Sequence, residues 1–245
     1  MFAVFWFFAI IRRFNLNLEV NMNNYKHDFI DFMVACEVLT FGDFVTKSGR
    51  KTPFFVNTGK YRTGEQISKL GEFYAESIME NTKGEFDVLF GPAYKGIPLA
   101  VSASIALSSK FGKNVSFCFN RKEIKDHGEG GNLIGHKLQK GDRVLIIEDV
   151  TTAGTSIRET VPLLKAAADI ELAALSVSVN RMERGTGEKS ALDEIRDDFG
   201  MKTFSIVNMA EVVEYLYGRK VNGKVLIDDE MKSRIEDYYK IYGAK

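Results

Sequence analysis

Cysteine is scarce in this sequence of 245 residues, and both cysteines, Cys36 and Cys118, lie in apolar runs. Neither is part of a CxxC pair, so the chain has no disulfide framework and no thiol metal or redox motif of that kind. We expect two buried thiols in a protein of a reducing compartment. The sequence therefore predicts a cytoplasmic location.

An excess of charge of either sign is also missing, because 33 Lys and Arg residues balance 33 Asp and Glu residues. A protein that binds nucleic acid by neutralising phosphates normally carries a basic excess. The same balance disfavours polybasic attachment to a membrane. With 45% hydrophobic and 27% charged residues, the composition is typical of a globular protein. We expect no nucleic acid and no membrane among its partners.

The N-terminal apolar run, MFAVFWFFAII (1–11), is too short for a membrane-spanning helix, which takes about 20 residues. Arg12 and Arg13 follow this run, whereas a secretory signal has its positive charges first and a small-residue cleavage site afterwards. We interpret residues 1–21 as an extension that the fold does not need. An interfacial anchor is the alternative.

Apolar spacing predicts alternating helices and strands along the rest of the chain. Helices are expected over 24–39, 67–78 and 96–110, and after 156, where Ser156 and Glu159 form a capping-box pattern. Asn208 and Glu211 form a second such pattern. Buried strands are expected over 87–92, 115–120, 143–150, 172–179 and 203–208.

This alternation predicts an α/β fold with a doubly wound, mainly parallel sheet. Two short strands around a polar turn at Ser48 and Gly49 come before it. We expect one domain over 22–245, with a small N-terminal hood (about 22–60) on a core (about 61–245). Residues 121–137 are polar and glycine-rich and show no periodicity.

The strongest chemical signal is the strand RVLIIEDV (143–150), which ends in Glu148 and Asp149. Small residues, TTAGTS (151–156), then lead into a helix, and ligands of open α/β sheets bind at this edge. Backbone N–H groups at a helix N-terminus bind anions. The loop lacks the lysine of a P-loop, and the chain lacks the GxGxxG fingerprint of dinucleotide-binding proteins, so both of these site types are excluded. A sugar phosphate would fit this pattern, with its hydroxyl groups at the two acids and its phosphate in the loop. The alternative is a strand that ends in two acids without binding a ligand and is followed by a capped helix.

The stretch IIEDVTTAGTS resembles the phosphoribosyl pyrophosphate motif of type I phosphoribosyltransferases. Four further blocks narrow the resemblance to the orotate phosphoribosyltransferases: FGDFVTKSGRKTPFFVNTG (41–59), FDVLFGPAYKGIPLA (86–100), CFNRKEIKDHGEGGNLIG (118–135) and NRMERGTGE (180–188). They follow the family's order and cover most of the chain from about residue 25. Glutamate stands first in the acid pair where some members have aspartate, and the type I class tolerates either. Residues 1–21 match nothing in the family.

The resemblance implies a pentosyltransferase that moves 5-phosphoribosyl from phosphoribosyl pyrophosphate to orotate, giving orotidine 5′-monophosphate and pyrophosphate in de novo pyrimidine (UMP) biosynthesis. It implies Mg²⁺ as the cofactor, held mostly by substrate and water and directly by no residue. It also implies a homodimer with shared active sites. The alternatives are a phosphoribosyltransferase for another base and a non-catalytic regulator that senses phosphoribosyl pyrophosphate. Lys47, the PFF segment of the hood and Arg181 together disfavour the first. The neutral charge and the intact segment RKEIKDHGEGG (121–131) disfavour the second.

The resemblance also implies the site residues. A cis peptide is implied between Ala93 and Tyr94, in a loop where Gly91 and Gly96 would let the backbone approach a ligand closely. The segment after Arg121 is implied to be a mobile basic lid over pyrophosphate. Phosphoribosyl pyrophosphate is implied to contact Lys47, Tyr94, Lys95, Arg121, Lys122, Lys125, His127, Glu148, Asp149, Val150, Thr151, Thr152, Ala153, Gly154, Thr155 and Ser156. The implied catalytic residues are Lys47, Lys95, Lys125 and Asp149.

Orotate is implied to contact Phe54, Phe55, Thr152 and Arg181. Strand alternation lets at most one of the two phenylalanines face the base with its side chain, and ordinary core is the alternative for both. A guanidinium at a strand end suits a planar carboxylate through two parallel hydrogen bonds. The alternative for Arg181 is a surface ion pair.

Overall fold

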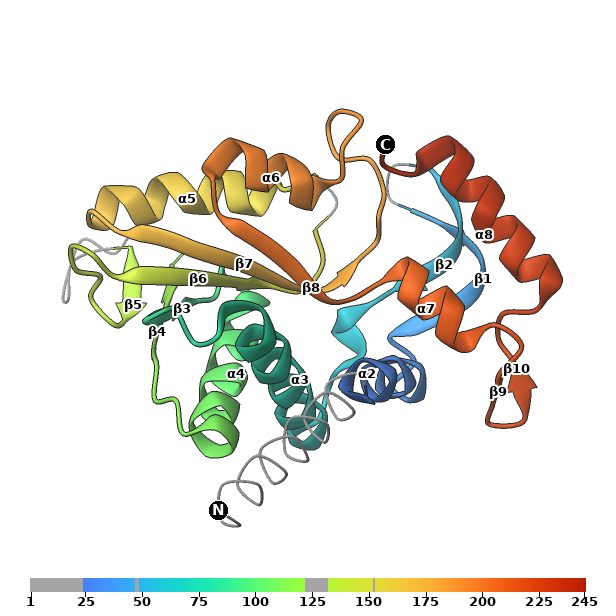
Figure 1. Cartoon of the computed structure of the whole chain (residues 1–245), viewed down its shortest axis with the longest axis horizontal. Coiled ribbons are helices and arrows are strands. Elements are labelled where there is room, and N and C mark those ends of the chain that lie inside the picture. The colour runs from blue at the N-terminus through green and yellow to red at the C-terminus, as the bar shows by residue number, and fades with distance from the viewer. Residues whose placement is uncertain (1–23, 47–48, 122–131, 152) are drawn as a thin grey trace, which may run out of the picture.

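A six-stranded sheet forms the centre of the computed structural model, which describes residues 24–46, 49–121, 132–151 and 153–245 (Figure 1). The strand order is β5-β4-β3-β6-β7-β8, and every neighbouring pair is parallel except β4 with β5. The strands are β3 (Val88–Phe90), β4 (Ser116–Asn120), β5 (Leu133–Gly135), β6 (Arg143–Glu148), β7 (Glu171–Asn180) and β8 (Lys202–Asn208). The predicted mainly parallel sheet is confirmed.

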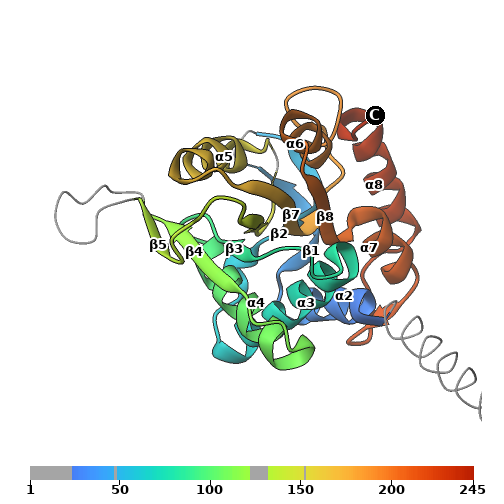
Figure 2. The same ribbon diagram turned by 60° about the vertical axis from the view of Figure 1, so that its left-hand side comes forward.

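Helices cover both faces of this sheet (Figures 1 and 2). One face carries α3 (Gly64–Thr82) and α4 (Gly96–Phe111), and the other carries α5 (Thr155–Ala167) and α6 (Ala191–Phe199). Strand β6 shows why, because its alternate side chains enter two separate hydrophobic clusters. Leu145 and Ile147 pack on the α3 and α4 side, and Val144 and Ile146 on the α5 and α6 side. The sheet is therefore doubly wound.

The elements before α3 and the elements after β8 lie together beside this core. After α2 (Asn24–Ala35), β1 (Leu39–Val45) and β2 (Lys51–Val56) form an antiparallel hairpin, followed by the 3-10 turn η1 (Thr58–Lys60). After β8 come α7 (Met209–Leu216), the small hairpin β9 (Lys220–Val221) and β10 (Lys224–Val225), and α8 (Asp229–Tyr242). Helix α8 packs against β2, at the right of Figure 1.

Several local predictions need correction. Helix α2 ends at Ala35 rather than at residue 39, because Glu37 adopts a left-handed φ of 56°. Helix α5 begins at Thr155, and Gly154, with a φ of 71°, stands at its N-cap without a side-chain cap. The Ser156 capping box is therefore wrong, since the Ser156 hydroxyl donates to Glu148 instead.

Other elements had no clear signal in the sequence. Strand β5 lies in the aperiodic segment and forms because its backbone pairs with the edge of β4. Helices α6 and α8 were not predicted. The second capping box is confirmed, with the Glu211 N–H donating to Asn208 Oδ1 and the Asn208 N–H donating to Glu211 Oε2.

Both cysteines are free, and Cys118 is buried as expected, but Cys36 is only half-buried. In the part of the chain that the structure describes, no helix has the length and apolar character needed to cross a membrane. The extension over residues 1–21 lies outside the described residues, as do Met22 and Asn23.

Candidate active site

The carboxyl ends of four parallel strands lie at one edge of the sheet and bring the predicted residues together. Tyr94 and Lys95 follow β3, and Arg121 follows β4. Glu148 ends the neighbouring strand β6, and Arg181 follows β7. This is the edge at which open α/β sheets bind their ligands.

One carboxylate oxygen joins three of these segments. Lys95 Nζ lies 2.8 Å from Asp149 Oδ2, and the Thr58 hydroxyl donates to the same oxygen at 2.6 Å. Burial raises the pKa of Asp149, but the hydrogen bonds from Lys95 and Thr58 outweigh burial and hold the pKa below its ordinary value. Asp149 is therefore ionised at neutral pH, at the point where the hairpin, the loop after β3 and the end of β6 meet.

The neighbouring acid has the opposite environment. Glu148 is 8% exposed, and burial raises its pKa to about 7, with the negative charge of Asp149 contributing to the rise. Its carboxylate accepts hydrogen bonds from the Ser156 hydroxyl at 2.9 Å and the Asp149 N–H at 3.1 Å. The two adjacent acids therefore differ in protonation near neutral pH, which suits different roles toward one sugar.

Hydroxyl groups from neighbouring elements fix the backbone of this acid pair. Tyr74 of α3 donates to the Glu148 carbonyl at 2.7 Å. Ser178 of β7 donates to the Asp149 carbonyl, also at 2.7 Å. Both acids are thus held against α3 and β7 independently of any ligand.

The loop between β6 and α5 is closed by its own residues. The Gly154 N–H donates to Thr151 Oγ1 at 3.0 Å, and the positive φ of Gly154 turns the chain into the helix. A Cβ at Gly154 would lie 2.9 Å from the Ile195 side chain, so the turn also packs against α6. Val150 and Ala153 are half-buried, while Thr155 and Ser156 are exposed at the N-terminus of α5, where backbone N–H groups can bind an anion.

The loop after β3 contains a cis peptide bond between Ala93 and Tyr94, as the resemblance implied. The Ala93 N–H donates to Asn120 Oδ1 at 2.8 Å, and the Tyr94 side chain is 66% exposed. A Cβ on Gly91 would lie 2.1 Å from the Gly96 carbonyl oxygen. The two glycines are therefore needed for close packing within the loop itself, and their part in the approach of a ligand stays a prediction.

On the side expected to hold the base, Arg181 is 7% exposed and forms an ion pair with Glu183. The surface ion pair considered from the sequence is thus a buried one. The Phe54 ring is fully buried, with the Arg181 guanidinium 4.9 Å from its centroid. Phe55 is half-buried and stacks on Phe44. Of the two phenylalanines, Phe54 belongs to the core and Phe55 keeps exposed surface.

Five predicted residues lie outside the described residues: Lys47, Lys122, Lys125, His127 and Thr152. The structure does describe their neighbours. The Arg121 N–H donates to the Asn132 carbonyl at 2.8 Å, which holds together the two ends of segment 122–131.

Sequence reasoning missed four residues of this edge: Thr58, Tyr74, Ser178 and Glu183. Thr58 and Glu183 lie inside quoted motifs, but nothing in their spacing indicates a contact with residues more than 90 positions away or with α8. Tyr74 and Ser178 fit an ordinary apolar helix and strand pattern. Among the described residues, no group of three or more His, Cys, Asp or Glu side chains could hold a metal ion.

The chain is similar to proteins of one enzyme family. A family model described as "Phosphoribosyl transferase domain" matches residues 57–206. An orotate phosphoribosyltransferase of Clostridium beijerinckii is 66% identical over 224 residues, which are 91% of this chain and all of the relative. The crystal structure of an orotate phosphoribosyltransferase from Francisella tularensis superimposes with a TM-score of 0.77 at 34% identity, covering 88% of this chain and 99% of that one.

A more distant structure shows the fold alone. It is an orotate phosphoribosyltransferase of Mycobacterium tuberculosis in complex with phosphoribosyl pyrophosphate, with a TM-score of 0.57 and 18% identity, covering 77% of this chain and 98% of that one. The strand-edge geometry, the family model and the relative that matches over its whole length all agree. This chain therefore belongs to the orotate phosphoribosyltransferases, a family of glycosyltransferase-type enzymes.

Proposed function

We propose that this enzyme transfers the 5-phosphoribosyl group from phosphoribosyl pyrophosphate to N1 of orotate, forming orotidine 5′-monophosphate and pyrophosphate. The observation that carries the proposal is the pair of unlike acids, Glu148 and Asp149, between the anion-binding loop and the loop that bears Lys95. One ionised and one partly protonated acid could both form hydrogen bonds with the hydroxyls of a ribose. The loops on either side could bind its 5′-phosphate and its pyrophosphate. The product makes de novo pyrimidine (UMP) synthesis the proposed pathway.

The sugar phosphate is proposed to lie along the end of β6. The ribose hydroxyls would bind Glu148 and Asp149, and the 5′-phosphate would bind loop 150–156 at the N-terminus of α5. The pyrophosphate would lie toward Tyr94, Lys95 and the basic segment that begins at Arg121. Lys122, Lys125 and His127 stay predicted contacts of that group.

Orotate is proposed to bind between the β1–β2 hairpin and the end of β7. Arg181 would pair with its carboxylate, and Phe55 would contact the ring. Lys47 and Thr152 stay predicted contacts there. Because Phe54 is buried beneath Arg181, its proposed part is to support the guanidinium rather than to touch the base.

In the proposed reaction, the bond between the anomeric carbon and pyrophosphate breaks as the bond to N1 forms, and the proton on N1 leaves to the pyrophosphate or to water. The sugar passes through an oxocarbenium-like state, which an ionised carboxylate close to the ring stabilises. The lowered pKa of Asp149, which keeps this carboxylate ionised, supports this role. The departing pyrophosphate gains negative charge, so Lys95 would leave Asp149 and bind the pyrophosphate oxygens.

Mg²⁺ is the proposed cofactor. The chain offers two carboxylates at this edge, and Asp149 already accepts bonds from Lys95 and Thr58. That donor set fits an ion that keeps several waters and is held mainly by substrate oxygens. When bound, Mg²⁺ would supply positive charge that neutralises the pyrophosphate.

The enzyme is also proposed to work as a homodimer with shared sites, in which Arg121 and Lys125 of one subunit act in its partner's site. A cytoplasmic location stays a prediction.

The function is tested by incubating the full chain with labelled orotate, phosphoribosyl pyrophosphate and Mg²⁺. We expect labelled nucleotide and pyrophosphate in equal amounts. Uracil, which lacks the carboxylate, serves as the comparison base and should react far more slowly. Equal use of uracil would contradict the assignment of the base, and binding of phosphoribosyl pyrophosphate without any nucleotide product would contradict catalysis.

A further inference from the structure

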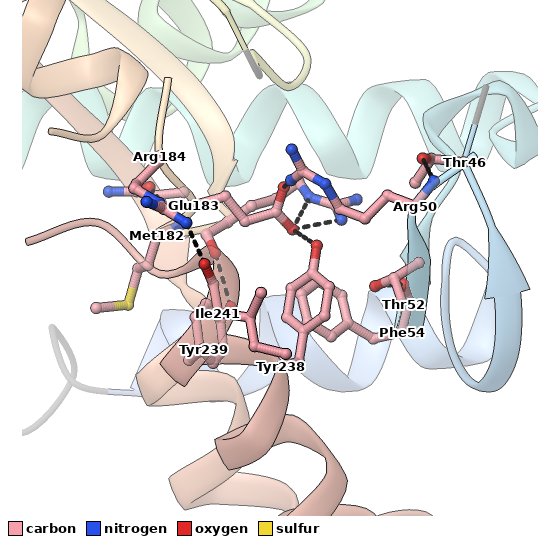
Figure 3. Close-up of polar contacts among 12 residues, drawn as sticks. Thr46, Arg50, Thr52, Phe54, Met182, Glu183, Arg184, Tyr238, Tyr239 and Ile241 are labelled. Carbon is pink, nitrogen blue, oxygen red and sulfur yellow. Dashed lines mark hydrogen bonds and ion pairs between the residues drawn. The ribbon is translucent and has the colours of Figure 1, made fainter. Parts of the chain in front are cut away.

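Glu183 joins three segments that are far apart in the sequence. It is 7% exposed, and its Oε1 accepts hydrogen bonds from Arg181 Nε at 3.0 Å, Arg181 Nη2 at 2.6 Å and the Tyr238 hydroxyl at 2.8 Å. Its Oε2 accepts from Arg50 Nη1 at 3.1 Å. Figure 3 shows the side chains of Arg50, Glu183 and Tyr238 converging from the turn before β2, the segment after β7, and α8.

These contacts set the direction of the Arg181 guanidinium. A guanidinium has a side edge formed by Nε and one Nη, and an end edge formed by the two Nη atoms. Glu183 occupies the side edge, and the Phe54 ring lies against one face. Nη1 has no hydrogen-bond partner within the described ranges. The end edge is therefore the one left for a planar carboxylate.

The same carboxylate contacts Arg50, which lies between β1 and β2. The Thr46 N–H donates to the Arg50 carbonyl at 2.9 Å, and the Arg50 N–H donates to Thr46 Oγ1 at 3.2 Å. Arg50 thus closes the turn from its C-terminal side. Its guanidinium also lies 4.6 Å from the centre of the Tyr242 ring, so α8 supports it from a second direction.

The backbone around Glu183 is held by the same C-terminal segment. The Arg184 N–H donates to the Tyr242 carbonyl at 2.9 Å, and the Ala244 N–H donates to the Met182 carbonyl at 3.0 Å. The Tyr239 hydroxyl donates to the Arg181 carbonyl at 2.7 Å. The residues on both sides of Glu183 are therefore fixed by α8 and the residues after it.

The charges of the cluster suit a nucleobase that carries a carboxylate. Two guanidinium groups and one carboxylate leave one net positive charge in a mostly buried cluster, where interactions with an anion are stronger than in water.

We propose that Glu183 is a positioning residue for the base. It aims Arg181 at the base carboxylate and ties Arg50, just before β2, to α8, without touching the substrate itself. The inference rests on the proposed function and deepens it, because it says which residue aligns the two sides of the orotate site.

The test compares Glu183→Gln with Glu188→Gln, the same substitution at an exposed ion pair with Lys245 five residues further along. In Glu183→Gln, the KM for orotate should rise about tenfold or more, the effect of weakening hydrogen bonds to a charged group. The KM for phosphoribosyl pyrophosphate should change by less than about threefold. Glu188→Gln should behave as the native enzyme. An unchanged KM for orotate, or an equal rise for both substrates, would overturn the proposal.

Tyr238→Phe gives a second, milder test, because it removes only one hydroxyl bonded to Glu183. It should raise the KM for orotate in the same direction by a smaller factor, and it decides the matter if Glu183→Gln does not fold. The native enzyme is assayed alongside. If the native enzyme makes no nucleotide from orotate, the proposed function fails; if it is active and neither variant loses orotate selectively, only the role of Glu183 fails.

Discussion

Lys95 and Asp149 form an ion pair, with Nζ 2.8 Å from Oδ2, between two neighbouring strand ends. The Lys95 side chain is 65% exposed, whereas Asp149 is mostly buried. The exposed Lys95 side chain can move, but the buried Asp149 carboxylate then needs another cation in its place to stay ionised. In the described state, Lys95 therefore pairs with the carboxylate that the proposed reaction assigns to the cationic sugar.

Replacing Asp149 by Asn tests the role of the charge. The variant keeps the shape but removes the negative charge beside the sugar, so turnover should fall at least about tenfold, equivalent to 1.4 kcal/mol in the barrier. Steady-state rates at saturating substrates measure this. The control is Asp169→Asn, at an exposed ion pair with Lys140, which should leave turnover unchanged. Near-native turnover in Asp149→Asn would make this residue structural.

The raised pKa of Glu148 predicts a pH dependence of stability. Between its ordinary pKa of 4.5 and about 7, the folded protein keeps a proton at Glu148 that the unfolded chain releases. Stability from this group is thus complete below 4.5 and is lost as the pH rises through about 7. Glu148→Gln, which cannot ionise, should gain stability relative to the native protein over that window.

Urea unfolding of both proteins at several pH values from 5 to 8 measures this difference. The lowered pKa of Asp149 acts in a separate window, because its contribution is present above its ordinary pKa of 3.8 and is lost only as the pH falls below it. A difference between the two proteins that stays constant from pH 5 to 8 would show that Glu148 has an ordinary pKa.

Thr58 should support the binding of the sugar phosphate through Asp149. Thr58→Val removes the hydroxyl that donates to Asp149 Oδ2 at 2.6 Å and keeps the shape of the side chain. The KM for phosphoribosyl pyrophosphate should rise roughly three- to tenfold, since a hydrogen bond to a charged group is lost. Thr58→Ser retains a hydroxyl and should restore binding. Equal behaviour of the two variants would dismiss the hydrogen bond as the cause.

Arg181→Lys tests the proposed carboxylate anchor. Lysine keeps the positive charge but loses the planar fork that can bind a carboxylate with two hydrogen bonds. Affinity for orotate should therefore weaken more than affinity for phosphoribosyl pyrophosphate, as measured by calorimetric titration of each ligand. Equal losses for both ligands would indicate that Arg181 does not anchor the base.

Shared active sites can be tested by mixing two inactive variants. One carries Arg121→Ala with Lys125→Ala, and the other carries Asp149→Asn. In a mixed dimer with reciprocal exchange, one site has its native acid and its partner's native basic segment. Random remixing of equal amounts gives about half mixed dimers, so activity should recover to roughly a quarter of the native value. Mixed dimers that form but stay inactive would mean that each subunit uses its own segment.

The sequence by itself determined the main layers of this protein. The apolar run of β6 can only be a strand buried on both faces, and the helix spacing around it requires a doubly wound sheet. Because parallel strands end at one edge, the sequence also placed Lys95, Asp149 and Arg181 at the same edge. The apolar period of each element and the alternation of strands with helices can be read along the chain, and this alternation favours parallel strands.

Only the tertiary structure decided the partners of those residues. The sequence of the edge strand β5 shows no apolar period. This strand forms through backbone hydrogen bonds to β4, which leave no pattern in the sequence. The cap of α5 is Gly154, since Ser156 is used by Glu148. The contacts of Asp149 with Thr58 and of Glu183 with Tyr238 join residues separated by 91 and 55 positions. Such contacts depend on how whole elements pack against one another, so the spacing of residues within one element cannot predict them.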